Sequence, residues 1–290
     1  MTYKIIELEQ GSTEWLALRK TKITATDTGV IMGLNPWKTP LMLWEEKLGL
    51  REPQAVNNKM REGSLLEEEA RDFINKMEDN DFKPVVLQSI EHLFMMASLD
   101  GMNSTGDIME IKCGEKSLHE AFRDEVPDYY YSQCQKQIFV SGCDSIYYFC
   151  YRSPEKRHNI KIRRDDAFIE KMIEVETAFY KCLMDFTPPP ATDRDFVKRN
   201  DDLWNFHTRE YKLAKSEKEK FQQNEDIHRN ILISLCDGQS SQGGGVRISK
   251  TVSKGRVNYS NIKELEGVDL EKYRGKNITS YRFTETKEEG

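Results

Sequence analysis

Apolar residues recur every three to four positions through most of the first 80 residues, which predicts helices. Polar or proline-containing breaks separate these helices, and hydroxyl or carboxylate side chains stand where N-caps are expected. The predicted elements are a strand at 4–8 and helices starting at Ser12 or Thr13, starting at Thr26 or Asp27, spanning 40–48 and spanning 64–77. The N-terminal part is therefore predicted to be mainly helical.

After residue 82, the apolar residues form short runs bounded by turn residues, a pattern typical of strands. Runs at 85–87, 93–99 and 108–112, with turns at Asp100-Gly101 and 104–107, predict an antiparallel meander. Beyond it, the pattern predicts a helix at 127–140, strands at 145–151 and 159–162, and a long helix at 166–186. This mixture predicts an α/β (α+β) core.

Three consecutive prolines at 188–190 end this pattern, because proline neither continues a helix nor donates to a sheet. We therefore predict a core domain at 1–190 and a C-terminal extension at 191–290. The extension is predicted to hold a helix at 204–235, a flexible Gly/Ser/Gln-rich loop at 237–245 and a β-hairpin at 246–259. The lysines of its helix alternate with glutamates as on a solvated surface, so no chemistry is assigned to it.

The composition is that of a folded, soluble protein, with 38% hydrophobic and 32% charged residues among 290. A formal net charge of −6 argues against non-specific coating of nucleic acid, so any DNA contact must be local. The six cysteines form no C-x-x-C pair, which argues against zinc-knuckle and iron–sulfur spacings. With no apolar run near ~20 residues and no signal-peptide core, we expect a cytoplasmic protein without a membrane partner.

The clearest chemical pattern consists of Asp100, Glu110 and Lys112 in the predicted meander. Glu110 and Lys112 are two apart on a strand and share a face, and Asp100 ends the preceding strand, where it can lie beside them. Two carboxylates and a backbone carbonyl make an oxygen site suited to Mg²⁺ or Mn²⁺. Next to such a metal, the Lys112 ammonium can orient the attacking water or help to deprotonate it. The pattern therefore predicts a hydrolytic metal centre.

The alternative is a solvated hairpin that carries these three residues by chance in a highly charged chain. Asp100 and Glu110 nevertheless have apolar neighbours, namely 95–97 before the first and Ile108, Met109 and Ile111 around the second. Burying an unpaired carboxylate is costly without a metal or another partner. This context favours the metal site.

Six short motifs support a family resemblance. They are Trp15-Leu-Ala-Leu-Arg19 followed by Ile23-Thr-Ala-Thr26, then Asn35-Pro36-Trp37, Gly63 to Arg71, Ser98 to Gly101, Glu110 to Cys113, and Tyr130 to Gln135. In this order they resemble the PD-(D/E)XK nucleases, and in particular the lambda-type, or YqaJ-like, viral alkaline exonucleases. The resemblance implies a restriction-endonuclease-like core in which helices flank a mixed central sheet.

The resemblance also implies an activity: a Mg²⁺-dependent exodeoxyribonuclease that degrades one strand of linear double-stranded DNA. It would act 5′ to 3′ from a 5′-phosphorylated end and leave a 3′ single strand for recombination, in a bacterial or phage-infected host cell. Two alternatives stay open. One is an endonuclease of the same superfamily, for repair or restriction, and the other is a non-catalytic DNA-end-binding recombination scaffold.

Site residues follow from the same resemblance. Asp100, Glu110 and the Ile111 carbonyl would hold the metal, and Lys112 would serve the nucleophilic water. Glu67 would support the metal through water or a second metal. Taken without the resemblance, the favoured interpretation of Glu67 is a first-turn glutamate that complements a helix dipole.

The resemblance also assigns roles to Gln133 and Met60, for which the sequence pattern itself gives weaker support. Gln133 and Gln135 face different directions on their predicted helix, so at most one reaches the metal, and Gln133 is the one we expect to do so. Glutamines on such a helix are otherwise simply its polar stripe. Met60 matches the place where related enzymes put an apolar wedge against the end of the duplex.

Arg19, Thr26 and Ser98 match the positions that hold the terminal 5′-phosphate in such exonucleases. An arginine fork with two hydroxyls, one near a helix N-terminus, suits a phosphate. The alternatives are a surface cation for Arg19 and ordinary caps for the hydroxyls. A further arginine of the family is not matched, because Leu118 stands near its place with His119 beside it.

Partners are implied as well. The resemblance points to a ring-shaped homo-oligomer, a trimer or tetramer, since an acidic monomer would hold DNA poorly whereas a ring with a basic lumen can thread one strand. Double-stranded DNA ends are the expected substrate. A single-strand annealing protein, which would coat the exposed 3′ strand, is the expected protein partner.

Overall fold

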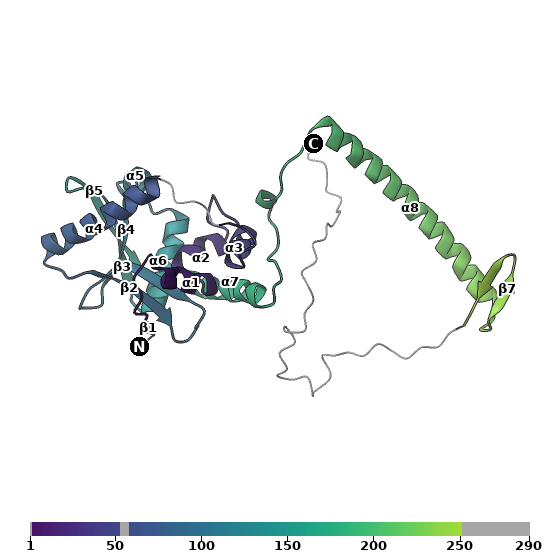
Figure 1. Cartoon of the computed structure of the whole chain (residues 1–290), viewed down its shortest axis with the longest axis horizontal. Helices are drawn as coiled ribbons and strands as arrows, with labels where there is room; N and C mark the ends of the chain where they lie inside the picture. The colour runs from purple at the N-terminus through teal and green to yellow at the C-terminus, as the bar shows by residue number, and fades with distance from the viewer. Residues whose placement is uncertain (1, 53–57, 251–290) are drawn as a thin grey trace. The chain divides into compact units, whose positions relative to one another are not determined.

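A computed structural model describes residues 2–52 and 58–250, excluding the side chains of 58–62 and 64. The chain divides into two units, Met1–Lys198 and Arg199–Gly290, which are described separately (Figure 1). The boundary follows residue 198 rather than 190, because Arg194 donates to the Asn35 carbonyl and Asp195 accepts from the Thr39 hydroxyl. Among the described helices, none is long and apolar enough to cross a membrane.

A six-stranded sheet forms the centre of the first unit, with its strands side by side in chain order. They are β1 (Tyr3–Ile5), β2 (Lys83–Ser89), β3 (Met96–Met102), β4 (Ile108–Lys112), β5 (Ser145–Ser153) and β6 (Lys156–Arg163). Neighbouring strands are antiparallel except β4 and β5, which run parallel. The predicted meander of β2, β3 and β4 and the mixed α/β class are confirmed.

Helices flank this sheet (Figure 1). They are α1 (Thr13–Thr21), α2 (Ala25–Ile31), α3 (Pro40–Lys47), α4 (Asn58–Glu78), α5 (Glu115–Ala121), α6 (Asp128–Ser141) and α7 (Asp166–Met184). Both sheet faces are covered. Successive β5 residues point to opposite faces, and they are buried in two different cores. Tyr148 and Cys150 belong to the core that includes α6 and α7, whereas Phe149 and Tyr151 belong to the core that includes α4.

Local polar contacts determine where the helices begin. Ser12 Oγ accepts from the Trp15 amide at 3.2 Å and caps α1, as predicted. Helix α2 begins at Ala25, earlier than expected, because Thr24 and Asp27 form a capping box around its first turn. Helix α5 was not predicted, and α4 begins at Asn58 rather than at 64.

The predicted turn at Asp100-Gly101 is wrong, because both residues lie within β3. Gly101 is needed there for close packing, since a Cβ at this position would meet Phe82 Cβ at 3.0 Å and Met109 Cε at 3.1 Å. The chain turns later, where the Asn103 side chain accepts from the Asp107 amide at 2.7 Å. Asp100 therefore lies within a strand rather than in a loop.

The second unit contains α8 (Asp202–Leu235), capped by Asp201, close to the predicted 204–235. It is followed by a small hairpin of β7 (Ser241–Gly243) and β8 (Val246–Ile248). The prediction of a loop over 237–245 is therefore wrong, because β7 lies within it and the hairpin begins before residue 246. Gly244 and Gly245 both have positive φ and make the turn that pairs the two strands. Residues 251–259 lie outside the described part of the chain.

Candidate functional site

Strands β3 and β4 bring Asp100, Glu110 and Lys112 together. Asp100 and Glu110 each lie next to the last paired residues of the two strands, Gly101 and Met109, so they stand close together where the ladder ends. Asp100 Oδ2 accepts a hydrogen bond from the Ile111 amide at 2.8 Å. Glu110 is 2% exposed, and its Oε1 forms an ion pair with Lys112 Nζ. The predicted trio is thus one connected cluster.

Glu67 joins this cluster from helix α4. Arg71, one turn later, donates to Glu67 Oε1 at 3.1 Å and to the backbone carbonyl of Asp100 at 2.7 Å. The arginine therefore ties the helix to the edge of β3 and keeps Glu67 on the Asp100 side. The neighbouring Glu69 points elsewhere, because its carboxylate accepts from the Tyr151 hydroxyl.

The cluster has more negative charge than its protein neighbours neutralise. Burial raises the pKa of Asp100 well above its ordinary value, and the nearby Glu110 and Glu67 carboxylates raise it further. Burial and Glu110 likewise raise the pKa of Glu67, against the opposing effect of Arg71. A divalent cation at this place would relieve the repulsion, so the residues present fit a metal.

The type of metal site is limited by the same geometry. Among residues 2–52 and 58–250, no three Asp, Glu, His or Cys side chains converge as a ligand set. A cation here would be held by Asp100 and Glu110, with the Ile111 carbonyl and water as further oxygen ligands. Mg²⁺ suits such a site, because it usually keeps several waters and takes only one or two carboxylates.

Lys112 is held as a cation. Burial by itself would lower the pKa of Lys112, but attraction to Glu110 and other neighbours outweighs it and raises that pKa above its ordinary value. The ammonium also lies 4.6 Å from the centroid of the Tyr130 ring. Lys112 can therefore donate hydrogen bonds to a reacting group and stabilise negative charge on it.

Helix α6 contributes two glutamines to Glu110. Gln133 Nε2 donates to Glu110 Oε1 at 2.5 Å, whereas Gln135 faces away and bonds the backbone of Arg163 and Asp165. Gln137 was not predicted, yet its Nε2 donates to Glu110 Oε2 at 2.5 Å and to the Ser98 carbonyl at 3.1 Å. Its spacing of four residues from Gln133 is the sequence signal that could have identified it.

Gln137 is fully buried, and its Oε1 has no hydrogen-bond partner in the described structure. We expect Gln137→Met to lower the metal affinity or the hydrolysis rate by about 10- to 100-fold, as for other residues that orient metal ligands. Metal titration of the hydrolysis rate measures this change. Gln135→Met is the matched control, because it removes hydrogen bonds from the other side of the same helix. Equal losses in both variants would show that the effect comes from helix stability.

The three predicted phosphate-binding residues are also brought together, with Trp15 between them. Arg19 donates to Thr26 Oγ1 at 3.1 Å, and its guanidinium lies 4.4 Å from the centroid of the Trp15 ring. Trp15 Nε1 in turn donates to Ser98 Oγ at 3.2 Å. Arg19 and Ser98 are half-buried and Thr26 is exposed, so solvent reaches this group. Since Ser98 also bonds Gln137, the group is connected to the carboxylate cluster.

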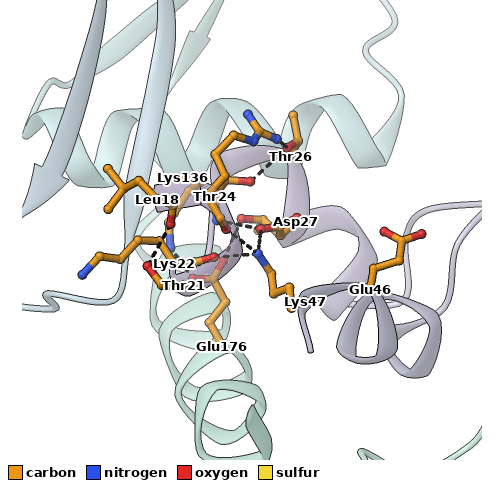
Figure 2. A network of polar contacts seen from close by, with 12 residues as sticks. Leu18, Thr21, Lys22, Thr24, Thr26, Asp27, Glu46, Lys47, Lys136 and Glu176 are labelled. Carbon is orange, nitrogen blue, oxygen red and sulfur yellow. Dashed lines mark hydrogen bonds and ion pairs between the residues drawn. The ribbon is translucent and has the colours of Figure 1, made fainter. Parts of the chain in front are cut away.

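A buried ion pair supports this group from behind (Figure 2). Lys47 lies 2.8 Å from Asp27 Oδ2 and donates to the backbone carbonyls of Arg19 and Lys22 at 3.0 and 2.6 Å. Despite burial, the Lys47 charge lowers the pKa of Asp27. Lys47 was not predicted, and it fixes the end of α1 against the start of α2, where Arg19 and Thr26 lie.

A second buried pair lies next to the first (Figure 2). Lys136 of α6 and Glu176 of α7 are both fully buried and paired, and Thr28 of α2 donates to Glu176 Oε1 at 2.6 Å. Three helices thus meet at one charged contact. The pair anchors α6, the helix that carries Gln133 and Gln137.

Two further sequence positions, Leu118 and Met60, were singled out in connection with DNA binding. Leu118 is 3% exposed and packed in the core, so the place of the family's further arginine holds no cation. Met60 lies in the first turns of α4, but its side chain is outside the described residues.

Comparisons with known proteins give a domain match and a similar fold. Residues 14–144 match the model of the YqaJ-like viral recombinase domain. The "Uncharacterized protein YqaJ" of Bacillus subtilis is 30% identical over 193 residues, which cover 64% of this chain and 60% of that protein. The chain therefore spans less than two thirds of that relative's length.

Two solved structures resemble this chain in fold. One is an alkaline exonuclease, LHK-Exo, from Laribacter hongkongensis, with a TM-score of 0.54 at 23% identity. The other is LHK-Exo in complex with dAMP, with a TM-score of 0.53 at 22% identity. Each match covers 61% of this chain and 94% of the exonuclease chain. Residues 14–144 are thus similar to the YqaJ-like viral recombinase domain, and the chain has a fold similar to that of an alkaline exonuclease.

Proposed function

We propose that this chain is a metal-dependent exodeoxyribonuclease that degrades one strand of linear double-stranded DNA, 5′ to 3′ from a 5′-phosphorylated end. The observation that carries the proposal is the connection of two sites. The carboxylate cluster with Lys112 lies on β3 and β4, and Ser98 on the same β3 links it to Arg19 through Trp15. One site suits phosphodiester hydrolysis and the other suits a terminal phosphate.

In the proposed reaction, Asp100, Glu110 and the Ile111 carbonyl hold Mg²⁺, or Mn²⁺ in its place. When bound, this ion lowers the pKa of water and neutralises charge on the phosphate. Lys112 stays protonated and orients the attacking water by hydrogen bonding. Gln133 and Gln137 hold the Glu110 carboxylate in position, and Glu67 supports the site through water.

The proposed direction of digestion rests on the Arg19 group. A 5′-phosphate carries more negative charge than an internal phosphodiester, and an arginine fork with hydroxyls favours it. The dAMP complex of LHK-Exo is consistent with a nucleotide monophosphate in this fold. DNA recombination is the proposed context, with the 3′ strand passed to a single-strand annealing protein.

Arg19→Ala is expected to reduce the preference for 5′-phosphorylated over 5′-hydroxyl duplex by about 10- to 100-fold, the value of one charge-assisted hydrogen bond. Initial digestion rates on the two duplexes measure it. Arg123→Ala removes an exposed arginine elsewhere and is expected to leave the preference unchanged. A variant that slows both substrates equally would contradict the role of Arg19.

The two alternative functions predict different results with circular DNA. An endonuclease of the same superfamily would cut closed circular and linear duplex at similar rates, whereas an exonuclease leaves the circle intact. A non-catalytic scaffold would bind ends without hydrolysing them. We also propose that the chain forms a ring, trimeric or tetrameric, and light scattering that shows only monomer at micromolar concentration would contradict it.

A further inference from the structure

Trp37 lies on the surface in an unusual setting for so large a side chain. Its indole is 63% exposed, and it meets the half-buried Tyr129 ring edge-on, at a centroid distance of 5.1 Å and an interplanar angle of 75°. An exposed tryptophan supported by a second aromatic ring presents a flat apolar surface to solvent. The metal site and the phosphate group make no use of it.

The loop that carries Trp37 is held in place. Asn35 Oδ1 accepts from the amides of Trp37 and Lys38, both at 2.9 Å, and Arg194 donates to the Asn35 carbonyl at 2.9 Å. The indole is therefore presented by an ordered turn, which lowers the entropic cost of using it as a contact.

Tyr129 is equally well positioned. Gly29 of α2 allows α2 to approach α6, the helix that carries Tyr129. A Cβ at position 29 would lie 3.2 Å from both Cα and Cβ of Tyr129. Burial raises the pKa of Tyr129 to about 12, so that its ring stays uncharged at neutral and moderately alkaline pH. Both rings thus offer neutral aromatic surface.

The pair is continuous with the proposed catalytic cluster. The centroids of Tyr129 and Tyr130 are 4.4 Å apart, and Tyr130 in turn lies 4.6 Å from Lys112 Nζ. These short steps place the Trp37 ring within about four base spacings of Lys112 Nζ, at roughly 3.4 Å per stacked base.

We infer that Trp37 and Tyr129 form a stacking site for an unpaired nucleobase of the DNA strand, within a few nucleotides of the scissile phosphate. The inference rests on the proposed nuclease function. Near the end of a duplex, the strand that enters a metal site must separate from its complement, and its bases lose their stacking partners. An aromatic surface at that point replaces the lost contact and accepts any base, because every base has a π-face. The ligand is therefore single-stranded DNA, recognised through its bases.

The proposed stacking site can be tested by measuring DNA binding under conditions in which no hydrolysis occurs. The affinity for single-stranded oligo(dT) and for an abasic oligonucleotide of equal length is measured in EDTA by fluorescence anisotropy. Trp37→Ala is expected to weaken oligo(dT) binding by about 5- to 100-fold, as for other base–aromatic contacts. It should change abasic binding much less, and Trp37→Phe should restore most of the affinity. Phe186→Ala, which removes another partly exposed aromatic paired with a tryptophan, should change neither.

Steady-state kinetics on duplex DNA provide a second readout. Trp37→Ala is expected to raise KM with little change in kcat. Equal losses for oligo(dT) and abasic DNA, or no loss for either, would overturn the stacking site while leaving the nuclease proposal intact. Conversely, base-dependent binding by a chain that never hydrolyses DNA would support the stacking site and reject the nuclease. Circular dichroism of each variant shows that it is folded.

Discussion

Replacing Asp100 by asparagine is expected to lower the rate of DNA hydrolysis by about 10³-fold or more, because the variant loses a metal ligand and charge stabilisation of the transition state. Lys112→Ala should cause a similar loss for a different reason, since it removes the donor that orients the water. The assay is release of nucleotides from a linear 5′-phosphorylated duplex, and EDTA should abolish it in the unmodified protein.

Metal binding separates the two roles. In titration calorimetry, Asp100→Asn is expected to lose Mg²⁺ binding, whereas Lys112→Ala should retain it. Because Asp100 is one of three mutually repelling carboxylates, its replacement should not lower the melting temperature in EDTA. Asp144→Asn, at an exposed position, is the control and should behave like the unmodified protein. Full activity in Asp100→Asn would refute the assignment of this cluster as the catalytic centre.

The second large effect is expected on stability, at the buried pair of Lys136 and Glu176. Burial raises the pKa of Glu176 and lowers that of Lys136, so for both groups the cost of burying a charge exceeds the attraction between them. Lys136→Met leaves the Glu176 carboxylate buried without its cation and should lower the free energy of unfolding by about 3–5 kcal/mol. Urea unfolding measures this change through the midpoint.

The double variant is the informative comparison for this pair. Lys136→Met with Glu176→Met removes both charges and keeps similar volume, so it should recover most of the lost stability. Thr28, which then loses its acceptor, limits the recovery. A double variant no more stable than Lys136→Met would show that the pair itself, and not an unpaired charge, determines stability here.

Much of the fold could be predicted from periodicity alone, because the cores on the two sheet faces impose a regular pattern on β5 and α7. The wrong predictions concern positions that are determined by specific local contacts, which the hydrophobic periodicity does not reveal. Gly101 resembles a turn residue in the sequence, but its function is to admit Phe82 and Met109. Likewise, the start of α2 is shifted because the Thr24 backbone amide donates to Asp27 Oδ2 at 2.8 Å.

At the candidate site, too, contacts between residues close in the sequence could be predicted and contacts between distant residues could not. Asp100, Glu110 and Lys112 lie within one β-hairpin, so strand geometry makes their proximity predictable from short sequence separations. Gln137 and Lys47 act across long separations, on Glu110 and on the backbone of Arg19. Their contacts depend on how α6 and α3 pack, which no local pattern specifies.

Strand β3 carries both proposed sites, and this has a consequence for the size of the product. Ser98 and Asp100 are two residues apart on one strand, which corresponds to about 7 Å at the ordinary rise per residue. If the proposed sites hold the end of the DNA at Ser98 and cut the bond at Asp100, this spacing matches one nucleotide, and digestion would advance in single-nucleotide steps whatever the sequence.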